Sequence, residues 1–249
     1  CSTLPPARIQ FTKLHMLYLQ LPKPLTEGKS YTVRFPSGLL AEDSAALTFD
    51  SKRLRSESVH TSQIGFLPSD PVKTAYLSTW MGTGGNLAYA DSLAFSVVRE
   101  SDGESVFSGR TRLVKKTGED RRRDHVGADV WEMDFSTLQK LGEYTVSVDG
   151  VGCSFPFRID EDVWQQPFYT SVRGLLHQRS GIELGPPYTD YVRPRSFHPA
   201  DGVKVYQSTY THDAPNPQGS IFLALVAGKT DETLPNAWGG YMDAGDWDR

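Results

Sequence analysis

Two aspartates near the end of the sequence, Asp243 and Asp246, stand three residues apart in the stretch DAGD. Ala244 and Gly245 between them are small enough to let a water molecule or a substrate approach both carboxylates. Two carboxylates on one side of a tight turn can hold and polarise a water. Hydrolysis of a glycosidic bond needs such a base together with a distant carboxylic acid that protonates the leaving oxygen. If the turn leads into a helix, the helix N-terminus would also favour the ionised form of Asp246.

The same spacing of aspartates is compatible with roles that involve no catalysis. Aspartates three residues apart also occur in helix caps and solvated turns. A calcium loop is a further alternative, because Asp243, Asp246 and Asp248 supply hard oxygen ligands, although the spacing of an EF-hand is not met. The chain contains no GxSxG elbow, Walker loop, HExxH or CxxC motif that would indicate a different chemistry.

Aromatic side chains stand beside the two aspartates. Trp238, Tyr241 and Trp247 supply flat surfaces of the kind on which sugar rings stack. Carboxylates and aromatic rings together are compatible with a carbohydrate-binding site in this stretch.

The composition is that of a globular protein with more than one domain. The chain has 249 residues, of which 38% are hydrophobic and 22% charged, and a domain usually occupies roughly 100 to 200 residues.

The net charge is −4, and the basic run of Lys115, Lys116 and residues 121–123 alternates with acids, as a solvated loop does, so no nucleic-acid partner is indicated. No stretch approaches the roughly 20 apolar residues that span a bilayer. Two cysteines, Cys1 and Cys153, exclude a disulfide-rich scaffold.

Short runs of β-branched and aromatic residues, separated by Gly, Pro, Asp and Ser, recur through the first part of the chain. Most alternate with the period of a half-buried strand. They occupy residues 14–21, 30–35, 74–80, 93–98, 129–135 and 143–148. We predict a β-strand segment over residues 1–57, which can be interpreted as the remainder of a preceding β-sandwich, and an immunoglobulin-like β-sandwich over residues 58–160.

Two of these runs resemble each other. Residues 25–35 and 138–148 both place Leu six residues before Tyr and continue Tyr-Thr-Val. The pattern suits the corner of a sandwich, where a tyrosine hydroxyl bonds to backbone a few residues upstream. Two related β units and two ordinary strands with a shared turn preference are both compatible with it.

The pattern changes to helical after residue 160. Over residues 165–179 the apolar positions have helical spacing, with Pro167 near the start and Gly181 just past the end. Residues 186–219 carry little periodicity, which is usual for functional or poorly ordered loops. The apolar stretch SIFLALVAG fits a helix or a strand equally well.

The order of these parts resembles glycoside hydrolase family 9, in the branch where an immunoglobulin-like domain precedes the catalytic barrel. The resemblance covers residues 58–249 and rests on VHTSQIGFLP, LLHQRSGIEL and GGYMDAGDWDR. It implies that residues 161–249 begin an (α/α)6 barrel and that the chain is an N-terminal fragment. It also implies hydrolysis of β-1,4-glucans with inversion, with Asp246 as general base and Asp243 positioning the water. The family's general acid, a glutamate far downstream, lies outside this sequence.

The sequence departs from the family pattern at a structural zinc site. Ser180 and Phe197 stand where many members have cysteine, so we expect no zinc despite His198. No cofactor is expected to be required, while calcium, which some members bind, stays open. Trp247 stands where tyrosine is usual.

The loop VRPRSFHPADG is more basic than we expect for the corresponding loop of a plain cellulase. The identity of the sugar that the enzyme cleaves is therefore left open. Arg195 and His198 are candidates for substrate contact, and Arg193 and Arg195 could meet an acidic sugar or be structural. His177 is expected to be packed or hydrogen-bonded.

These features predict an inverting glycoside hydrolase that acts on β-linked glucan or a related saccharide, secreted or periplasmic. A hypothesis of another class is a non-catalytic β-sandwich module that stabilises a partner or binds glycan. Because this chain lacks the general acid, it should be inactive by itself.

Overall fold

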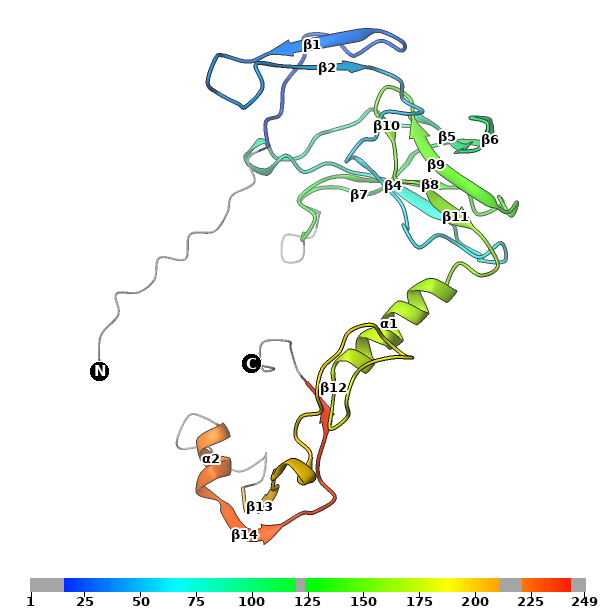
Figure 1. Ribbon diagram of the computed structural model, residues 1–249. Helices are drawn as coiled ribbons and strands as arrows, with labels where there is room; N and C mark the ends of the chain where they lie inside the picture. Colours follow the sequence, from blue (N-terminus) through cyan, green and yellow to red (C-terminus); the bar gives the residue numbers. More distant parts are fainter. Residues whose placement is uncertain (1–15, 120–123, 211–220, 243–249) are drawn as a thin grey trace. The chain divides into compact units, whose positions relative to one another are not determined.

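The computed structural model describes residues 16–119, 124–210 and 221–242, and the chain divides into two compact units (Figure 1). The sandwich unit is Cys1–Val163, and the helical unit is Trp164–Arg249.

Two antiparallel sheets form the body of the sandwich unit. One has the order β3-β4-β8-β7, and the other has the order β10-β9-β5-β6 with β11 also paired to β9. The strands of the first sheet are β3 (Val59–His60), β4 (Thr74–Leu77), β7 (Arg112–Lys115) and β8 (Val130–Asp134). Those of the second are β5 (Ala94–Arg99), β6 (Ser105–Arg110), β9 (Gly142–Val148), β10 (Gly152–Cys153) and β11 (Phe157–Ile159), and a short 3-10 helix, η1, spans Gly82–Gly84.

The core lies between these two sheets. Apolar side chains alternate along the strands because successive residues of a strand face opposite sides. The buried positions are Ala75 and Leu77 in β4, Phe95 and Val97 in β5, Trp131 and Met133 in β8, and Tyr144, Val146 and Val148 in β9. Burial of each large side chain stabilises the fold by about 1.5–3 kcal/mol. The predicted alternation of buried and more exposed positions is therefore confirmed in β4 and β8. In β9 the polar residues Thr145 and Ser147 of the other face are buried as well.

Lys73, at the entry to β4, is fully buried in this core region. Its Nζ donates to the carbonyl oxygens of Pro68 at 3.0 Å, Asp70 at 2.7 Å and Ser136 at 3.1 Å. Three acceptors satisfy the three donors of an ammonium group. The lysine thus joins the loop before β4 to the end of β8.

The tyrosine hydroxyls of the repeated pattern do bond to upstream backbone. Tyr144 donates to the carbonyl oxygens of Lys140 at 2.9 Å and Leu141 at 3.3 Å, and a Cβ at Gly142 would lie 2.9 Å from the Tyr144 hydroxyl. The Tyr31 hydroxyl accepts from the Thr26 backbone N–H at 2.8 Å. Tyr144 belongs to the five-stranded sheet, whereas Tyr31 lies in a two-stranded one.

That two-stranded sheet is a hairpin of β1 (Ser30–Arg34) and β2 (Ser44–Thr48). An isolated hairpin is marginally stable in water, and the segment after β2 holds it to the sandwich. The Ser51 N–H donates to Glu27 Oε2 at 3.1 Å, and the Ser147 hydroxyl donates to the Ser51 carbonyl at 2.8 Å. Phe49, which directly follows β2, is buried.

The prediction of a strand over residues 14–21 is wrong for residues 16–21, the part of this segment that the structure describes. Its apolar side chains are exposed. Alternation shows only that a segment could fill half a sheet, and a strand also needs a partner to pair its backbone N–H and C=O groups. Within the described part of the chain, no strand pairs with residues 16–21.

The helical unit contains α1 (Gln165–His177) and α2 (Ile221–Ala227). The helix predicted over residues 165–179 is confirmed as far as His177, whereas Arg179 belongs to a strand. The ambiguous apolar stretch is helical. The 3-10 helix η2 spans Pro199–Asp201. Two short antiparallel pairs complete the unit: β12 (Arg179–Ser180) with β15 (Gly240–Tyr241), and β13 (Tyr206–Ser208) with β14 (Lys229–Thr233).

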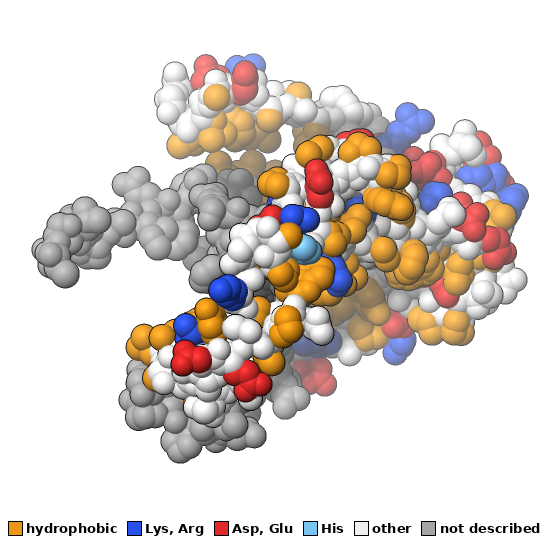
Figure 2. All heavy atoms as spheres, turned by 60° about the horizontal axis from the view of Figure 1, so that its bottom comes forward, with side chains coloured by type: hydrophobic (Ala, Val, Ile, Leu, Met, Phe, Trp, Pro, Cys, Tyr) orange, Lys and Arg blue, Asp and Glu red, His pale blue; other side chains and the backbone are white. Residues whose placement is uncertain are grey.

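Residues 164–210 and 221–242 do not form a closed helical barrel. The apolar residues of both helices lie largely on the surface: Phe168 is 71% exposed in α1, and Val226 is 72% exposed in α2. Figure 2 shows that hydrophobic side chains occupy much of the face it presents. Neither helix, nor any other among the described residues, has the length and apolarity to cross a bilayer.

Candidate functional site

The residues that precede the acidic motif are fixed by the short pair of β12 and β15, seen in Figure 1 as the red strand beside β12. Arg179 lies opposite Tyr241, and Ser180 lies opposite Gly240. The Met242 N–H donates to the Gln178 carbonyl at 2.7 Å. The last described residues before Asp243 are therefore bound to the chain that follows α1.

Two glycines allow this close approach. Gly181 has φ of 81°, and a Cβ there would lie 2.9 Å from the Gly239 Cα and 3.0 Å from the Trp238 ring. The Gly181 N–H donates to the Ser196 carbonyl at 2.7 Å, and the Gly239 N–H donates to the Phe197 carbonyl at 3.2 Å. These bonds bring the basic loop beside Trp238.

Of the three aromatic residues predicted to bind sugar, the structure describes Trp238 and Tyr241. Trp238 is 43% exposed, and the His198 ring packs edge-on against it with centroids 4.4 Å apart. Tyr241 is 63% exposed, and the Arg179 guanidinium lies 5.1 Å from its ring centroid. Both rings thus keep accessible surface while a neighbour supports them.

The His198 imidazole also caps the short helix η2. Its Nδ1 accepts from the Ala200 N–H at 3.1 Å. A neutral imidazole that accepts at Nδ1 carries its proton on Nε2. Nε2 is therefore the nitrogen of His198 that could donate to a ligand.

Arg195 forms a two-pronged ion pair with Asp201, with Nε–Oδ2 at 2.8 Å and Nη2–Oδ1 at 2.9 Å. The Arg195 hydrogen bond lowers the pKa of Asp201, and Asp201 in turn raises the pKa of Arg195. Both side chains are 43% exposed, so solvent weakens the pair. A sugar that contacted Arg195 would share its guanidinium with Asp201.

An apolar pocket of about 460 Å³ lies beside these residues. Trp238 and Tyr241 line it together with Phe197, Phe222 and Val205. A second cavity of about 300 Å³ is also lined by Trp238, together with Leu234. Sequence reasoning missed Phe222 and Arg179, because only long-range contacts bring them to this site.

The acidic motif itself is outside the described residues, which end at Met242 before the final segment. The predictions for Asp243, Asp246 and Trp247 therefore stay predictions. Ser180 and Phe197 both line the apolar pocket, and neither offers a thiolate. Within the described ranges no three His, Cys, Asp or Glu side chains cluster as metal ligands.

His177, expected to be packed or hydrogen-bonded, is both. Its Nε2 lies 2.7 Å from the Thr189 hydroxyl, and its ring lies 5.5 Å from that of Tyr191.

The sandwich is similar to a known domain family. Residues 55–153 match the family of the cellulase N-terminal Ig-like domain. Endoglucanase D of Acetivibrio thermocellus is 26% identical over 220 residues, which are 88% of this chain and 29% of that protein. The chain thus spans less than a third of the length of this curated relative.

One solved structure supports the same fold. A Bacteroides ovatus GH9 structure aligns with 77% of this chain and 29% of its own, at 20% identity and a TM-score of 0.51. The alignment with a metagenome-derived glycoside hydrolase family 9 endoglucanase covers 75% of this chain and 29% of that enzyme, at 23% identity and a TM-score of 0.49. The resemblance to glycoside hydrolase family 9 enzymes with an N-terminal immunoglobulin-like domain is confirmed, and the family match lies on that domain.

Proposed function

We propose that this chain is part of an inverting glycoside hydrolase that acts on β-linked glucan, with Asp246 as the general base and Asp243 as its assistant. The observation that carries the proposal is the presence of two partly exposed rings, Trp238 and Tyr241, just before the acidic motif. The β12–β15 pair fixes Tyr241, and the His198 ring packs against Trp238. The similarity to an endoglucanase over most of the chain supports the substrate class.

Hydrolysis would need carboxyl groups on both sides of the scissile bond. Asp246 accepts a proton from a water that attacks the anomeric carbon, Asp243 holds that water, and a carboxylic acid outside residues 1–249 protonates the leaving oxygen. Inversion needs room for the water, so the two carboxyl groups should stand roughly 6.5–9.5 Å apart across the sugar. Trp238, Tyr241 and Trp247 would stack on sugar rings, and His198 and Arg195 would contact hydroxyl groups.

The exposed apolar faces of α1 and α2 support a further part of the proposal, the (α/α)6 barrel. Helices that are apolar on their outward faces are stable when neighbouring helices cover them. A second stretch of chain that completes the barrel would cover Phe168 and Val226 and enclose the site. The enzyme would be secreted or periplasmic and need no cofactor. Zinc is not expected, and structural calcium stays open.

A non-catalytic role for the isolated chain has its own support, because the family match covers the immunoglobulin-like domain alone. Within the main proposal this domain stabilises the catalytic part. The 249-residue chain would then show no turnover, since this proposal assigns the general acid to a residue outside residues 1–249.

The stereochemistry of the first product tests the proposal. The full-length enzyme is mixed with cellopentaose, and the anomeric protons of the products are followed by NMR before mutarotation. We expect the α-anomer to appear first. Initial release of the β-anomer would contradict inversion and with it the role of Asp246 as a base acting on water.

A further inference from the structure

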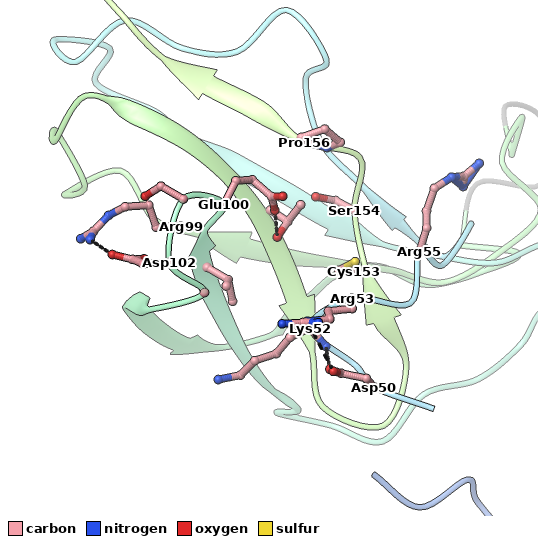
Figure 3. A pocket seen from close by; sticks show the side chains of 14 residues that line it. Asp50, Lys52, Arg53, Arg55, Arg99, Glu100, Asp102, Cys153, Ser154 and Pro156 are labelled. Atoms are coloured by element: carbon pink, nitrogen blue, oxygen red, sulfur yellow. Dashed lines mark hydrogen bonds and ion pairs between the residues drawn. The ribbon is translucent and has the colours of Figure 1, made fainter. Parts of the chain in front are cut away.

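A polar pocket of about 810 Å³ lies within the immunoglobulin-like domain (Figure 3). The segment after β2, the turn between β5 and β6, and strands β9 and β10 form its walls. Its volume is in the range of small-ligand sites, which is roughly 300–1,000 Å³. None of its residues takes part in the proposed catalytic site.

The wall formed by residues 50–56 is held in place by backbone bonds to β10. The Cys153 N–H donates to the Leu54 carbonyl at 2.9 Å, and the Ser56 N–H donates to the Cys153 carbonyl at 2.8 Å. Gly152 has φ of 127°, and a Cβ there would lie 2.6 Å from the Leu54 oxygen. The pocket is therefore bounded by fixed backbone on this side.

Glu100 supplies a hydrogen-bond acceptor in the middle of the pocket, where Figure 3 shows it near Ser154. Its Oε1 accepts from the Thr145 hydroxyl at 3.0 Å. A carboxylate has about four acceptor positions, so Glu100 can accept further bonds from a ligand. The Ser154 hydroxyl already bonds the Val146 N–H and the Phe155 carbonyl.

Lys52 and Arg53 supply donors at the rim. Lys52 Nζ bonds the Ser105 hydroxyl at 3.2 Å, and Arg53 Nε lies 3.9 Å from Asp50 Oδ2 with its side chain 88% exposed. Arg99, by contrast, is held by Asp102 at 2.7 Å and by a second carboxylate at 3.0 Å. Lys52 and Arg53 can thus turn toward a ligand, whereas Arg99 is already engaged.

The charges of the lining are mixed, with four basic residues (Lys52, Arg53, Arg55 and Arg99) and three acidic ones (Asp50, Glu100 and Asp102). An anion would meet Glu100 and Asp50, and a cation would meet the arginines. The Cys153 thiol is buried, and burial together with Glu100 and Asp50 raises its pKa. A protonated thiol is neither a nucleophile nor a metal ligand.

We propose that this pocket binds the end of a neutral oligosaccharide, with Glu100 accepting from sugar hydroxyls and Lys52 and Arg53 donating to them. A polyhydroxyl ligand offers donors and acceptors without net charge, which matches the mixed lining. That the sugar is a β-glucan rests on the proposed function. No aromatic ring is among the described residues that line the pocket, so binding depends on hydrogen bonds.

The test uses the 249-residue chain, labelled with ¹⁵N and titrated with cellotetraose. We expect saturable amide shifts at Ser101, Gly103 and Thr145. Glu100→Gln should weaken binding about tenfold, because it removes the charge of the acceptor and turns one of its two acceptor oxygens into an NH2 donor. Glu143→Gln is the matched control: it makes the same change on β9 outside the pocket and should leave the affinity unchanged.

Unfolding curves of each variant check the fold, and Lys52→Met replaces Glu100→Gln if that variant is unfolded. Unchanged affinity in the folded pocket variants, or shifts confined to residues 238–242, would overturn the proposal. So would tighter binding of tetragalacturonate, because it would assign the pocket to acidic sugars. Equal affinity for maltotetraose and cellotetraose would overturn only the inference that the bound sugar is a β-glucan. The anomer experiment on the full-length enzyme is unaffected by these results, so failure of the pocket and failure of the proposed function are distinguishable.

Discussion

Phe157 in the immunoglobulin-like domain is 1% exposed, whereas Phe168 in the helical unit is 71% exposed. Phe157 packs against the rings of Phe66, Phe135 and Tyr144 at 5.4–6.0 Å between centroids. Phe168 lies on a helix whose apolar residues are largely on the surface. The sandwich buries its own core, while the helical unit presents apolar surface, which further helices would cover in the enzyme that we propose.

The largest expected effect compares these two phenylalanines directly. Phe157→Ala should lower the free energy of unfolding of the 249-residue chain by about 3–5 kcal/mol, because it leaves a cavity in the core. Phe168→Ala should change it by about 0.5 kcal/mol or less, as an exposed substitution does. Urea denaturation followed by circular dichroism measures both. Similar losses in the two variants would show that the comparison of burial is mistaken.

Lys73 gives the next largest effect, because a charged group buried in the sandwich depends on its acceptors. Lys73→Met should cost about 2–3 kcal/mol, since the carbonyl oxygens of Pro68, Asp70 and Ser136 lose a charged donor. Lys204→Met, at an exposed position of the helical unit, is the control. The same denaturation experiment applies, and equal stability of the Lys73 variant and the parent chain would contradict the importance of these bonds.

The tyrosine hydroxyls should have smaller effects. Tyr144→Phe removes bonds from a fully buried hydroxyl and should cost about 1 kcal/mol. Tyr31→Phe, in the exposed hairpin, should cost less, because water replaces the lost partner. Thermal unfolding of both variants provides the comparison, and a larger loss for Tyr31→Phe would refute it.

The smallest effects concern acid stability. The Gly118 N–H and the Lys115 ammonium hold the pKa of Asp124 well below its usual value, and Arg195 lowers that of Asp201 to a lesser degree. A carboxylate with a lowered folded-state pKa contributes stability that is present above about pH 4 and is lost as the pH falls toward the folded-state pKa. Asp124→Asn should therefore flatten the acid side of the unfolding-temperature profile more than Asp201→Asn does. A larger flattening in Asp201→Asn than in Asp124→Asn would contradict the assignment of the larger pKa shift to Asp124.

Local patterns predicted much of the fold. Alternating residues in the four central strands indicated their buried faces, and helical spacing with Pro167 and Gly181 indicated α1. The same alternation failed at residues 16–21, because pairing is a long-range property that the segment itself does not encode. Strand partners also decided which of the two repeated tyrosines joined the sandwich.

The candidate site was predictable only in part. Trp238 and Tyr241 were identified by residue type and by their place beside the acidic motif. Their partners His198 and Arg179, and the pocket wall from Phe222, depend on contacts between distant stretches of chain. The polar pocket around Glu100 is a stronger example, because four separate elements supply its walls and no sequence motif marks it.

The central claim is that Asp246 activates the attacking water, and the full-length enzyme tests it most directly. Asp246→Asn keeps the shape of the side chain but removes the base, so kcat on cellopentaose should fall by about 10²–10⁴-fold while the protein stays folded. Asp231→Asn makes the same change at an exposed position of β14 and should retain most of the activity. Near-normal kcat in Asp246→Asn would contradict the account.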